Sequence, residues 1–365
     1  MKVLVIWRLL TVGGVNAGWR NRAIYFKQNG IETHFLYTTD HGGMHMMKDV
    51  ATVFLTKDSK EICKIIRSNN YDAIIIVDTQ DAYYWLKEAD YQGPVIVEAR
   101  TPEIVKLAPQ LAPIVNYKPE LLIVPSEYQR RVVSILFKGV PCKVIYNGVN
   151  RHFFRPLSLT LQEHWIPPVN SENKKIVGWI GRLDKRKNWL MLCKIAKLVQ
   201  QERDDIQFWI IGGNKSVQKE QFATYWHEKN LTSIIQWFPV IPYQEMPMVY
   251  AKIKESGGCT LATTRGESFG NTFIESMACG VPVVAPAIAS IPEIILHGIT
   301  GRLYREEHVR GAIKQLYRVI DAGESRDVMS DACVNQVATH FDISLCANEY
   351  VNLLRDIVDR RAKSE

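Results

Sequence analysis

Two cationic side chains lie in a turn between an expected strand and an expected helix in the second half of the 365-residue chain. Arg182 follows the apolar segment 175–181, and Lys187 comes just before the helical pattern of residues 189–202. A helix N-terminus offers free N–H groups and a partial positive charge, which favour phosphate. A guanidinium and an ammonium together suit a diphosphate. The alternative interpretation is a solvated basic loop.

Two carboxylates follow further along the chain. Glu267 lies in a loop flanked by glycines, and Glu275 lies about one turn inside a helix expected over 272–278. A carboxylate only accepts hydrogen bonds and sugar hydroxyls donate them, so both residues could address one ligand above the helix N-terminus. Alternatively, Glu275 only complements the helix dipole. No Asp-x-Asp occurs and the seven cysteines form no Cys-x-x-Cys, so no metal site is expected.

The elements that must position these residues alternate short apolar runs with helical patterns. In the first half, strands are expected over 3–7, 33–37, 73–77, 94–98, 121–124 and 143–146, with helices over 19–29 and 60–69. In the second half, strands are expected over 175–181, 207–211, 258–262 and 281–285, with helices over 189–202, 272–278 and 342–361. Short apolar strands between helices are typical of parallel sheets covered on both faces.

The sequence therefore predicts an α/β protein with two doubly wound, Rossmann-like domains. Residues 1–155 form the first domain, the proline-containing stretch 156–174 is a linker, and residues 175–341 form the second domain. Residues 342–365 contain a final amphipathic helix. Ligands of such sheets bind beyond the carboxyl ends of the strands, which is where the cationic turn and the Glu267 loop fall.

Composition narrows the class of protein. Hydrophobic residues make up 47% and charged residues 23%, as in ordinary globular proteins. The net charge of +7 is spread along the chain, whereas nucleic-acid binding favours a basic stripe. We find no signal peptide and no run of about 20 apolar residues, and therefore expect a cytoplasmic protein. A weak peripheral contact with the inner face of the membrane stays open.

Several motifs together resemble one family. They are Gly181-Arg182-Leu183 with Lys187, Glu267-x7-Glu275 with Ser268-Phe269-Gly270, and the runs 146–149, 275–284, 291–295 and 298–301. This combination resembles the retaining glycosyltransferases of family four. The resemblance implies the GT-B fold, in which two Rossmann-like domains face a cleft and a C-terminal helix returns to the first domain.

The resemblance also implies roles for individual residues. The catalytic set is Arg182, Lys187 and Glu267: the two cations grip the diphosphate of a nucleotide-sugar donor, and Glu267 binds hydroxyls of the transferred sugar. Glu275 binds the ribose. The stretch 237–241 holds the base together with a glycine pair. The full donor-binding set is Gly13, Gly14, Gly212, Gly213, Val240, Ile241, Ser268, Phe269, Gly270, Asn271, Thr272 and Glu275.

The chain departs from the family's pattern in three places. The first domain has no His at 77–81 or 97–101, where the family often has one. Ala289-Ser290 replaces a double glycine, and the usual Pro-Ser is replaced around Ala262–Thr264.

The function expected from the resemblance is that of a retaining, metal-independent, hexosyltransferase-like enzyme. It uses a nucleotide-diphosphate sugar as co-substrate, needs no other cofactor, and acts on a sugar, a lipid-linked or a small-molecule acceptor, not on nucleic acid. The alternatives are a GT-B-fold epimerase acting on a nucleotide sugar and a nucleotide-sugar-binding protein without transfer activity.

Overall fold

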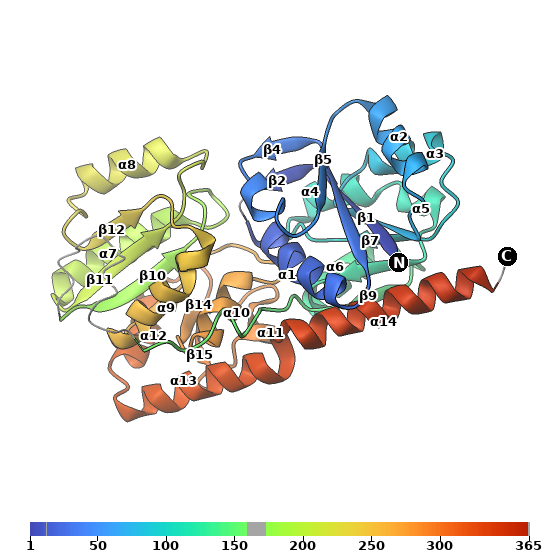
Figure 1. The fold of residues 1–365 in the computed structure, drawn as a ribbon. Helices are drawn as coiled ribbons and strands as arrows, with labels where there is room; N and C mark the ends of the chain where they lie inside the picture. The colour runs from blue at the N-terminus through green and yellow to red at the C-terminus, as the bar shows by residue number, and fades with distance from the viewer. Residues whose placement is uncertain (12, 159–172, 364–365) are drawn as a thin grey trace. The chain divides into compact units, whose positions relative to one another are not determined.

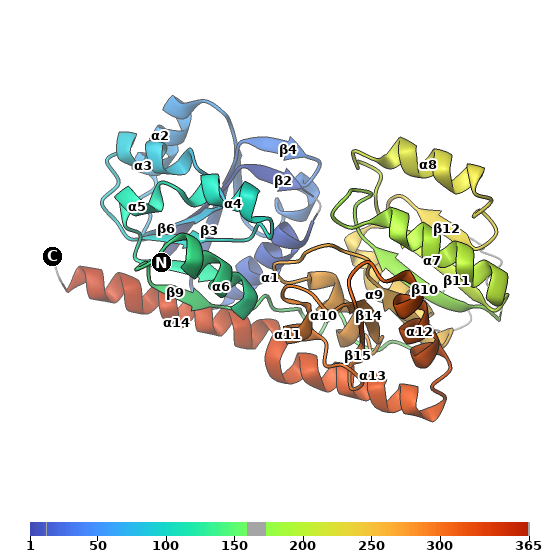
Figure 2. The same cartoon turned by 180° about the vertical axis from the view of Figure 1, so that it is seen from behind.

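A computed structural model describes residues 1–11, 13–158 and 173–363 (Figure 1; Figure 2 shows it from behind). The chain divides into two compact units: residues 1–150 with 341–365 form the first, and residues 151–340 form the second. Most of the expected linker at 156–174 lies outside the described residues. Within the described ranges, no helix is both long enough and apolar enough to cross a membrane.

The first unit is built on a parallel sheet with strand order β5-β3-β1-β6-β7-β8-β9. Its central strands β1 and β6 are almost wholly buried, which explains why they read as continuous apolar runs. A separate parallel pair joins β2 to β4. The strands are β1 (Lys2–Trp7), β2 (Leu9–Thr11), β3 (Glu32–Tyr37), β4 (Thr39–His41), β5 (Thr52–Leu55), β6 (Ala73–Val77), β7 (Val95–Glu98), β8 (Leu121–Val124) and β9 (Cys142–Val144).

Helices cover this sheet, and the C-terminal helix is one of them. Tyr350 of that helix packs edge-on against Trp19 and Phe26, with ring centroids 5.9 and 5.6 Å apart. Its N-terminus is capped by the Asp342 carboxylate, which accepts a 2.8 Å hydrogen bond from the Ser344 N–H. The helices are α1 (Gly14–Gln28), η1 (Met44–Met46), α2 (Ser59–Ser68), α3 (Ala82–Glu88), α4 (Ile104–Leu111), α5 (Ile114–Tyr117), α6 (Glu127–Leu136) and α14 (Ile343–Ala362).

The second unit has a parallel sheet with strand order β12-β11-β10-β13-β14-β15. Its strands are β10 (Lys175–Ile180), β11 (Ile206–Ile211), β12 (Ile235–Phe238), β13 (Cys259–Leu261), β14 (Val283–Pro286) and β15 (Gly301–Tyr304). The helices are α7 (Trp189–Glu202), α8 (Lys219–Glu228), η2 (Tyr243–Glu245), α9 (Met246–Glu255), α10 (Asn271–Ala278), α11 (Ile291–Ile294), α12 (Val309–Ile320) and α13 (Glu324–Gln336), followed by η3 (Val337–Phe341).

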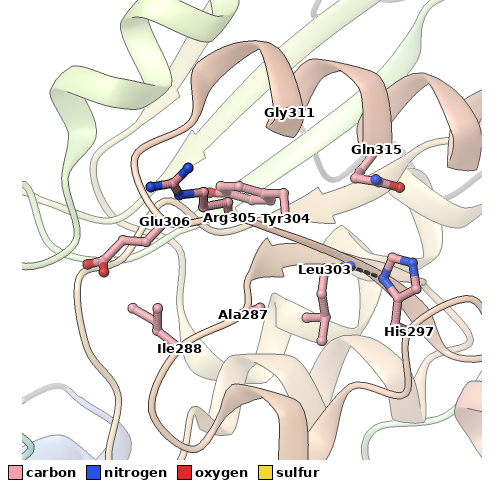
Figure 3. Close-up of a pocket in the computed structure, with 9 residues that line it drawn as sticks. All are labelled: Ala287, Ile288, His297, Leu303, Tyr304, Arg305, Glu306, Gly311 and Gln315. Carbon is pink, nitrogen blue, oxygen red and sulfur yellow. Dashed lines mark hydrogen bonds between the residues drawn. The ribbon is translucent and has the colours of Figure 1, made fainter.

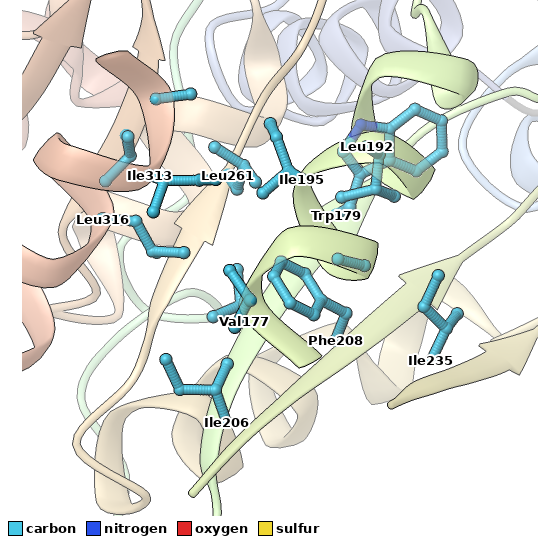
Figure 4. Packing of buried hydrophobic residues seen from close by; sticks show 14 of the residues in the cluster. Val177, Trp179, Leu192, Ile195, Ile206, Phe208, Ile235, Leu261, Ile313 and Leu316 are labelled. Carbon is cyan, nitrogen blue, oxygen red and sulfur yellow. The ribbon is translucent and has the colours of Figure 1, made fainter. Parts of the chain in front are cut away.

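The core of the second unit lies between this sheet and two of its helices (Figure 4). Val177 and Phe208 of the strands pack in one cluster with Leu192 of α7, and Ile313 and Leu316 join this cluster from α12. All five side chains are buried. This packing fixes β10, β11 and α7, and therefore the turn that joins β10 to α7.

The predicted α/β class with parallel sheets is confirmed. One helix starts earlier than expected: α1 begins at Gly14, not at Trp19. The carbonyl of Gly13 accepts the hydrogen bond of the Ala17 N–H at 3.0 Å, which starts the helix. Gly13 and Gly14, two of the predicted donor-binding residues, therefore stand at the N-terminus of α1. Glycine has poor helix propensity, so the first turn of this helix could not be recognised in the sequence.

Candidate functional site

The carboxyl ends of β10, β11, β13 and β14 meet at one edge of the second unit's sheet, because all four strands are parallel. Most of the residues predicted to bind a donor lie in the loops after these strands. Gly13 and Gly14 belong to the first unit, where they are exposed at the start of α1.

An ion-pair cluster lies at this edge. The Lys187 ammonium donates to Oε1 of Glu267 at 2.6 Å, and the Arg186 guanidinium donates to Oε2 at 3.1 Å. Arg186 also donates to the Gly266 carbonyl at 2.8 Å. The structure therefore brings two of the three predicted catalytic residues together and adds Arg186, which the sequence reasoning missed.

Burial and charge act against each other in this cluster. Glu267 is only 7% exposed, and burial alone would raise the pKa of its carboxyl. The Lys187 and Arg186 charges outweigh burial and lower the pKa of Glu267 to about 2. Burial lowers the pKa of Lys187 below its ordinary value, and the Glu267 carboxylate opposes that shift. Glu267 is consequently an ionised hydrogen-bond acceptor throughout the physiological pH range.

Arg182 stands apart from this cluster. Its side chain is 63% exposed and its Nη2 lies 3.0 Å from Oδ2 of Asp184. Oδ1 of Asp184 accepts a 2.7 Å hydrogen bond from the Lys187 N–H, which shapes the turn. An exposed ion pair of this kind contributes little to stability, so Arg182 can reach another anion at low cost.

A sharp turn leads from the Glu267 loop into α10. Gly270 has a φ of +112°, and a Cβ there would lie 2.5 Å from the Phe273 ring, so this position requires glycine. Phe269 is buried, and Asn271 and Thr272 are partly buried where α10 begins. Lys187, Thr272 and Phe273 line the same small cavity of about 20 Å³. The N-terminus of α10 is therefore next to the cation of the ion-pair cluster.

Glu275 has a different environment from Glu267. It is 7% exposed and accepts a 3.3 Å hydrogen bond from the Tyr250 hydroxyl. Burial raises the pKa of Glu275 to about 8, and the Tyr250 hydrogen bond opposes that shift. Glu275 is therefore mostly protonated at neutral pH, which its place in the sequence did not reveal.

The residues predicted to hold the base lie in the loops after β11 and β12. Gly212 has a φ of +104°, and a Cβ there would lie 2.9 Å from the Gly181 carbonyl oxygen. The Trp237 indole donates to the Gly212 carbonyl at 2.9 Å. Gly213 continues this turn, Val240 is exposed and Ile241 is partly buried. The glycine pair thus packs directly against the start of the cationic turn.

The first unit has a buried charged network where the family often has a His. Nε of Arg100 donates to Glu98 at 2.8 Å, and its Nη1 donates to Asn147 at 2.7 Å. The Asp78 carboxylate accepts from the Arg100 N–H at 3.0 Å. Burial raises the pKa of Asp78 to about 6, although the hydrogen bonds from Arg100 and Thr101 oppose it. In the sequence, these segments differ from the family's pattern by their lack of a His, and nothing there indicates this network.

A second hollow, of about 850 Å³, lies beside β15 and α12 (Figure 3). It is lined by Ala287, Ile288, His297, Leu303, Tyr304, Arg305, Glu306, Gly311 and Gln315. The His297 ring accepts a 2.9 Å hydrogen bond from the Leu303 N–H. None of these described lining residues is among the predicted catalytic or donor-binding residues. Across the described ranges, no three His, Cys, Asp or Glu side chains form a group that could hold a metal ion.

Most of the second unit is similar in sequence to known proteins. Residues 162–334 match the family described as glycosyl transferases group 1. These residues, somewhat less than half of the chain, are similar to that family. The group 1 segment contains the ion-pair cluster, the Gly212-Gly213 turn and α10.

Two curated relatives carry the name D-inositol 3-phosphate glycosyltransferase. The one from Corynebacterium aurimucosum is 26% identical over 186 residues, which is 50% of this chain and 43% of that protein. The one from Thermobispora bispora is 22% identical over 285 residues, which is 75% of this chain and 62% of that protein. The matches thus span less than two thirds of either relative.

Solved structures extend the likeness to nearly the whole chain. Anabaena Alr3699/HepE, in complex with UDP and glucose, has a TM-score of 0.82 and 17% identity, covering 97% of this chain and 99% of that one. Sucrose-phosphate synthase from Thermosynechococcus elongatus has a TM-score of 0.80 and 16% identity, covering 99% and 100%. The predicted GT-B fold is confirmed.

Replacing Lys187 with Met should lower the free energy of unfolding by about 3 kcal/mol, because Glu267 would keep a buried charge with one fewer partner. Chemical denaturation measures this change. The double variant Lys187→Met/Glu267→Gln should lose less than the sum of the single variants, and Lys185→Met, at an exposed neighbour, should change stability by less than about 0.5 kcal/mol. Additive single effects would contradict the buried pairing.

Glu275 should make stability depend on pH. Since its pKa rises from an ordinary 4.5 to about 8 on folding, the folded chain holds a proton that the unfolded chain releases. Between pH 5 and pH 8, wild-type protein should therefore lose stability relative to Glu275→Gln by up to about 1.4 kcal/mol per pH unit. Denaturation curves across this range measure the difference, with Glu220→Gln as an exposed control. A constant difference would refute the raised pKa.

Proposed function

We propose that this chain is a retaining glycosyltransferase that moves a sugar from a nucleoside-diphosphate sugar to an acceptor without a metal ion or another cofactor. The observation that carries the proposal is the gathering of Lys187, Glu267, the Gly212-Gly213 turn and the N-terminus of α10 at one sheet edge. The match of residues 162–334 to the group 1 glycosyl transferases and the glycosyltransferase names of the relatives support it.

The cations would stabilise the leaving group. As the bond between the anomeric carbon and the phosphate oxygen breaks, negative charge develops on the nucleoside diphosphate. Lys187 and the N–H groups at the start of α10 are fixed in advance, which is what electrostatic stabilisation requires. The planar guanidinium of Arg182 can donate to two phosphate oxygens at once. Because this side chain is exposed, it can reach the diphosphate.

The two carboxyl groups would bind different parts of the donor. Glu267 is ionised, so it accepts hydrogen bonds from hydroxyls of the transferred sugar. Glu275 is mostly protonated at neutral pH, and in that form its carboxyl both donates and accepts, which suits adjacent ribose hydroxyls. Gly212, Gly213, Val240 and Ile241 would hold the base through the backbone.

Retention would follow from attack on the face that the diphosphate leaves. The acceptor oxygen bonds to the anomeric carbon, the carbon–phosphate oxygen bond breaks, and the acceptor proton passes to the departing phosphate oxygen. This route needs no protein base, in keeping with a first unit that has no His at 77–81 or 97–101. The acceptor would be a sugar, a lipid-linked molecule or a small molecule, and peripheral membrane contact stays a prediction.

Arg182→Ala should lower turnover by roughly ten- to 150-fold, because it removes a charge-assisted contact of about 1.5–3 kcal/mol. Stability should stay unchanged, since the side chain is exposed. Steady-state kinetics and thermal denaturation measure the two effects, with Lys185→Ala as the neighbouring exposed control. Wild-type turnover in Arg182→Ala would remove this residue from the diphosphate site.

A thermal-shift panel of UDP-glucose, UDP-N-acetylglucosamine, GDP-mannose and ADP-glucose should identify the donor, because a ligand of the folded state raises its apparent stability.

With that donor and an acceptor panel, NMR of the product should show that the anomeric configuration of the donor is retained. Addition of EDTA should leave the rate of transfer unchanged. Inversion would contradict the retaining mechanism, and loss of activity restored by metal would contradict metal independence. Donor conversion without acceptor would indicate an epimerase, and donor binding without turnover a binding protein.

A further inference from the structure

Three buried hydroxyls lie behind the ion-pair cluster: those of Thr263, Thr264 and Ser290. Their residues are 2%, 1% and 0% exposed, respectively. They stand where the chain departs from the resembled family's Pro-Ser and double-glycine pattern. All three bond to backbone carbonyls of the loops that carry the cluster, so they act on the positions of these loops. The Thr264 side chain also hydrogen-bonds to Glu267 and helps to lower the pKa of that carboxyl.

Thr263 holds the lysine side of the cluster. Its Oγ1 accepts a hydrogen bond from the Trp179 indole at 2.9 Å and lies 2.9 Å from the Lys187 carbonyl and 3.0 Å from the Asn188 carbonyl, to which it donates. Trp179 is itself buried in β10. The relay therefore ties the backbone of Lys187 to the rigid sheet.

Ser290 holds the glutamate side. Its hydroxyl lies 2.9 Å from the Glu267 carbonyl and 3.1 Å from the Phe269 carbonyl, and donates to this pair of oxygens. The preceding Ala289 has a φ of +50°, a conformation that costs energy for a residue with a Cβ. The loop after β14 thus keeps a strained backbone while Ser290 holds both sides of Ser268.

Thr264 connects the turn that carries Lys187 to the loop that carries Glu267. Its Oγ1 lies 3.3 Å from the Arg186 carbonyl and 3.1 Å from the Gly266 carbonyl. The loop after β13 is in this way fastened to the cationic turn at the same place where Arg186 contacts Glu267. The three hydroxyls together fix both backbones from which the Lys187–Glu267 contact is made.

We propose that Thr263 and Ser290 are positioning residues of the donor site, Thr263 for the Lys187 ammonium and Ser290 for the Glu267 carboxylate. Neither touches the donor. Each hydroxyl restricts the motion of its loop before the donor binds. The Lys187 ammonium and the Glu267 carboxylate are therefore already in position for the diphosphate and the sugar, and binding need not order these loops. This inference rests on the proposed function, and it assigns the two hydroxyls to different parts of the donor.

The test compares the affinities of UDP-glucose and UDP, or of the panel's best nucleotide sugar and its nucleoside diphosphate, by calorimetry. Ser290→Ala should weaken UDP-glucose binding and lower kcat by about ten-fold or more while leaving UDP affinity within about two-fold, because the proposed partner of Glu267 is the sugar. Thr263→Val should weaken both ligands, because the proposed partner of Lys187 is the diphosphate, which both ligands carry. Thr263→Ser keeps the hydroxyl and should restore affinity to within about three-fold of wild type.

Ser330→Ala is the matched control, because its buried hydroxyl donates to the Gly280 carbonyl at 2.6 Å on another side of the second unit. All rates are divided by the folded fraction, so a shared loss of stability cancels. If wild-type protein binds nothing in the panel, the proposed function falls and this inference with it. If wild-type protein binds and transfers but Ser290→Ala and Thr263→Val behave like Ser330→Ala, the inference alone is overturned.

Discussion

The buried contact between Lys187 and Glu267 is the constraint on which the site depends. Two charges taken out of water cost several kcal/mol each unless their geometry and hydrogen bonds are well satisfied. A second cation, Arg186, and the short 2.6 Å contact meet that condition here. The contact can form only if the turn after β10 and the loop after β13 lie side by side, and the adjacent parallel pairing of those strands ensures it.

The contact between Lys187 and Glu267 also determines which carboxyl groups are ionised at this edge of the second unit's sheet. A carboxylate with a pKa of about 2 lies one hydrogen bond from an ammonium, while Glu275 on the following helix has a pKa of about 8. Two carboxyl groups eight positions apart thus take opposite protonation states at neutral pH. Glu267 contacts two cations, whereas Glu275 is buried and accepts a hydrogen bond from the Tyr250 hydroxyl. This separation suits a ligand that presents phosphates, sugar hydroxyls and ribose hydroxyls to one sheet edge.

Much of the fold could be predicted from the sequence, because buried parallel strands are continuous apolar runs. The bounds of β6, β8 and α7 coincide with those predicted. Short or weakly apolar elements such as β12 were missed, and α1 was predicted to start too late because of its glycines. The pairing of Arg186 with Glu267 and the neutral state of Glu275 could not be predicted from the sequence. The first depends on a contact between residues 81 positions apart, and the second on burial beside Tyr250, which is 25 positions away. The roles of the site residues toward a donor stay predictions.

The pKa of the Lys187 ammonium decides whether a diphosphate binds at this sheet edge. NMR of protein with 13Cε-labelled lysine measures that pKa, and the variant Lys187→Arg assigns the Lys187 signal. Burial holds this pKa below its ordinary value in the structure. A nucleoside diphosphate bound by Lys187 brings further negative charge to the ammonium. We therefore expect that saturating UDP, or the panel's best nucleoside diphosphate, raises the pKa of Lys187. An unchanged or lowered pKa of Lys187 at saturation would show that the diphosphate lies elsewhere and would contradict the proposed donor site.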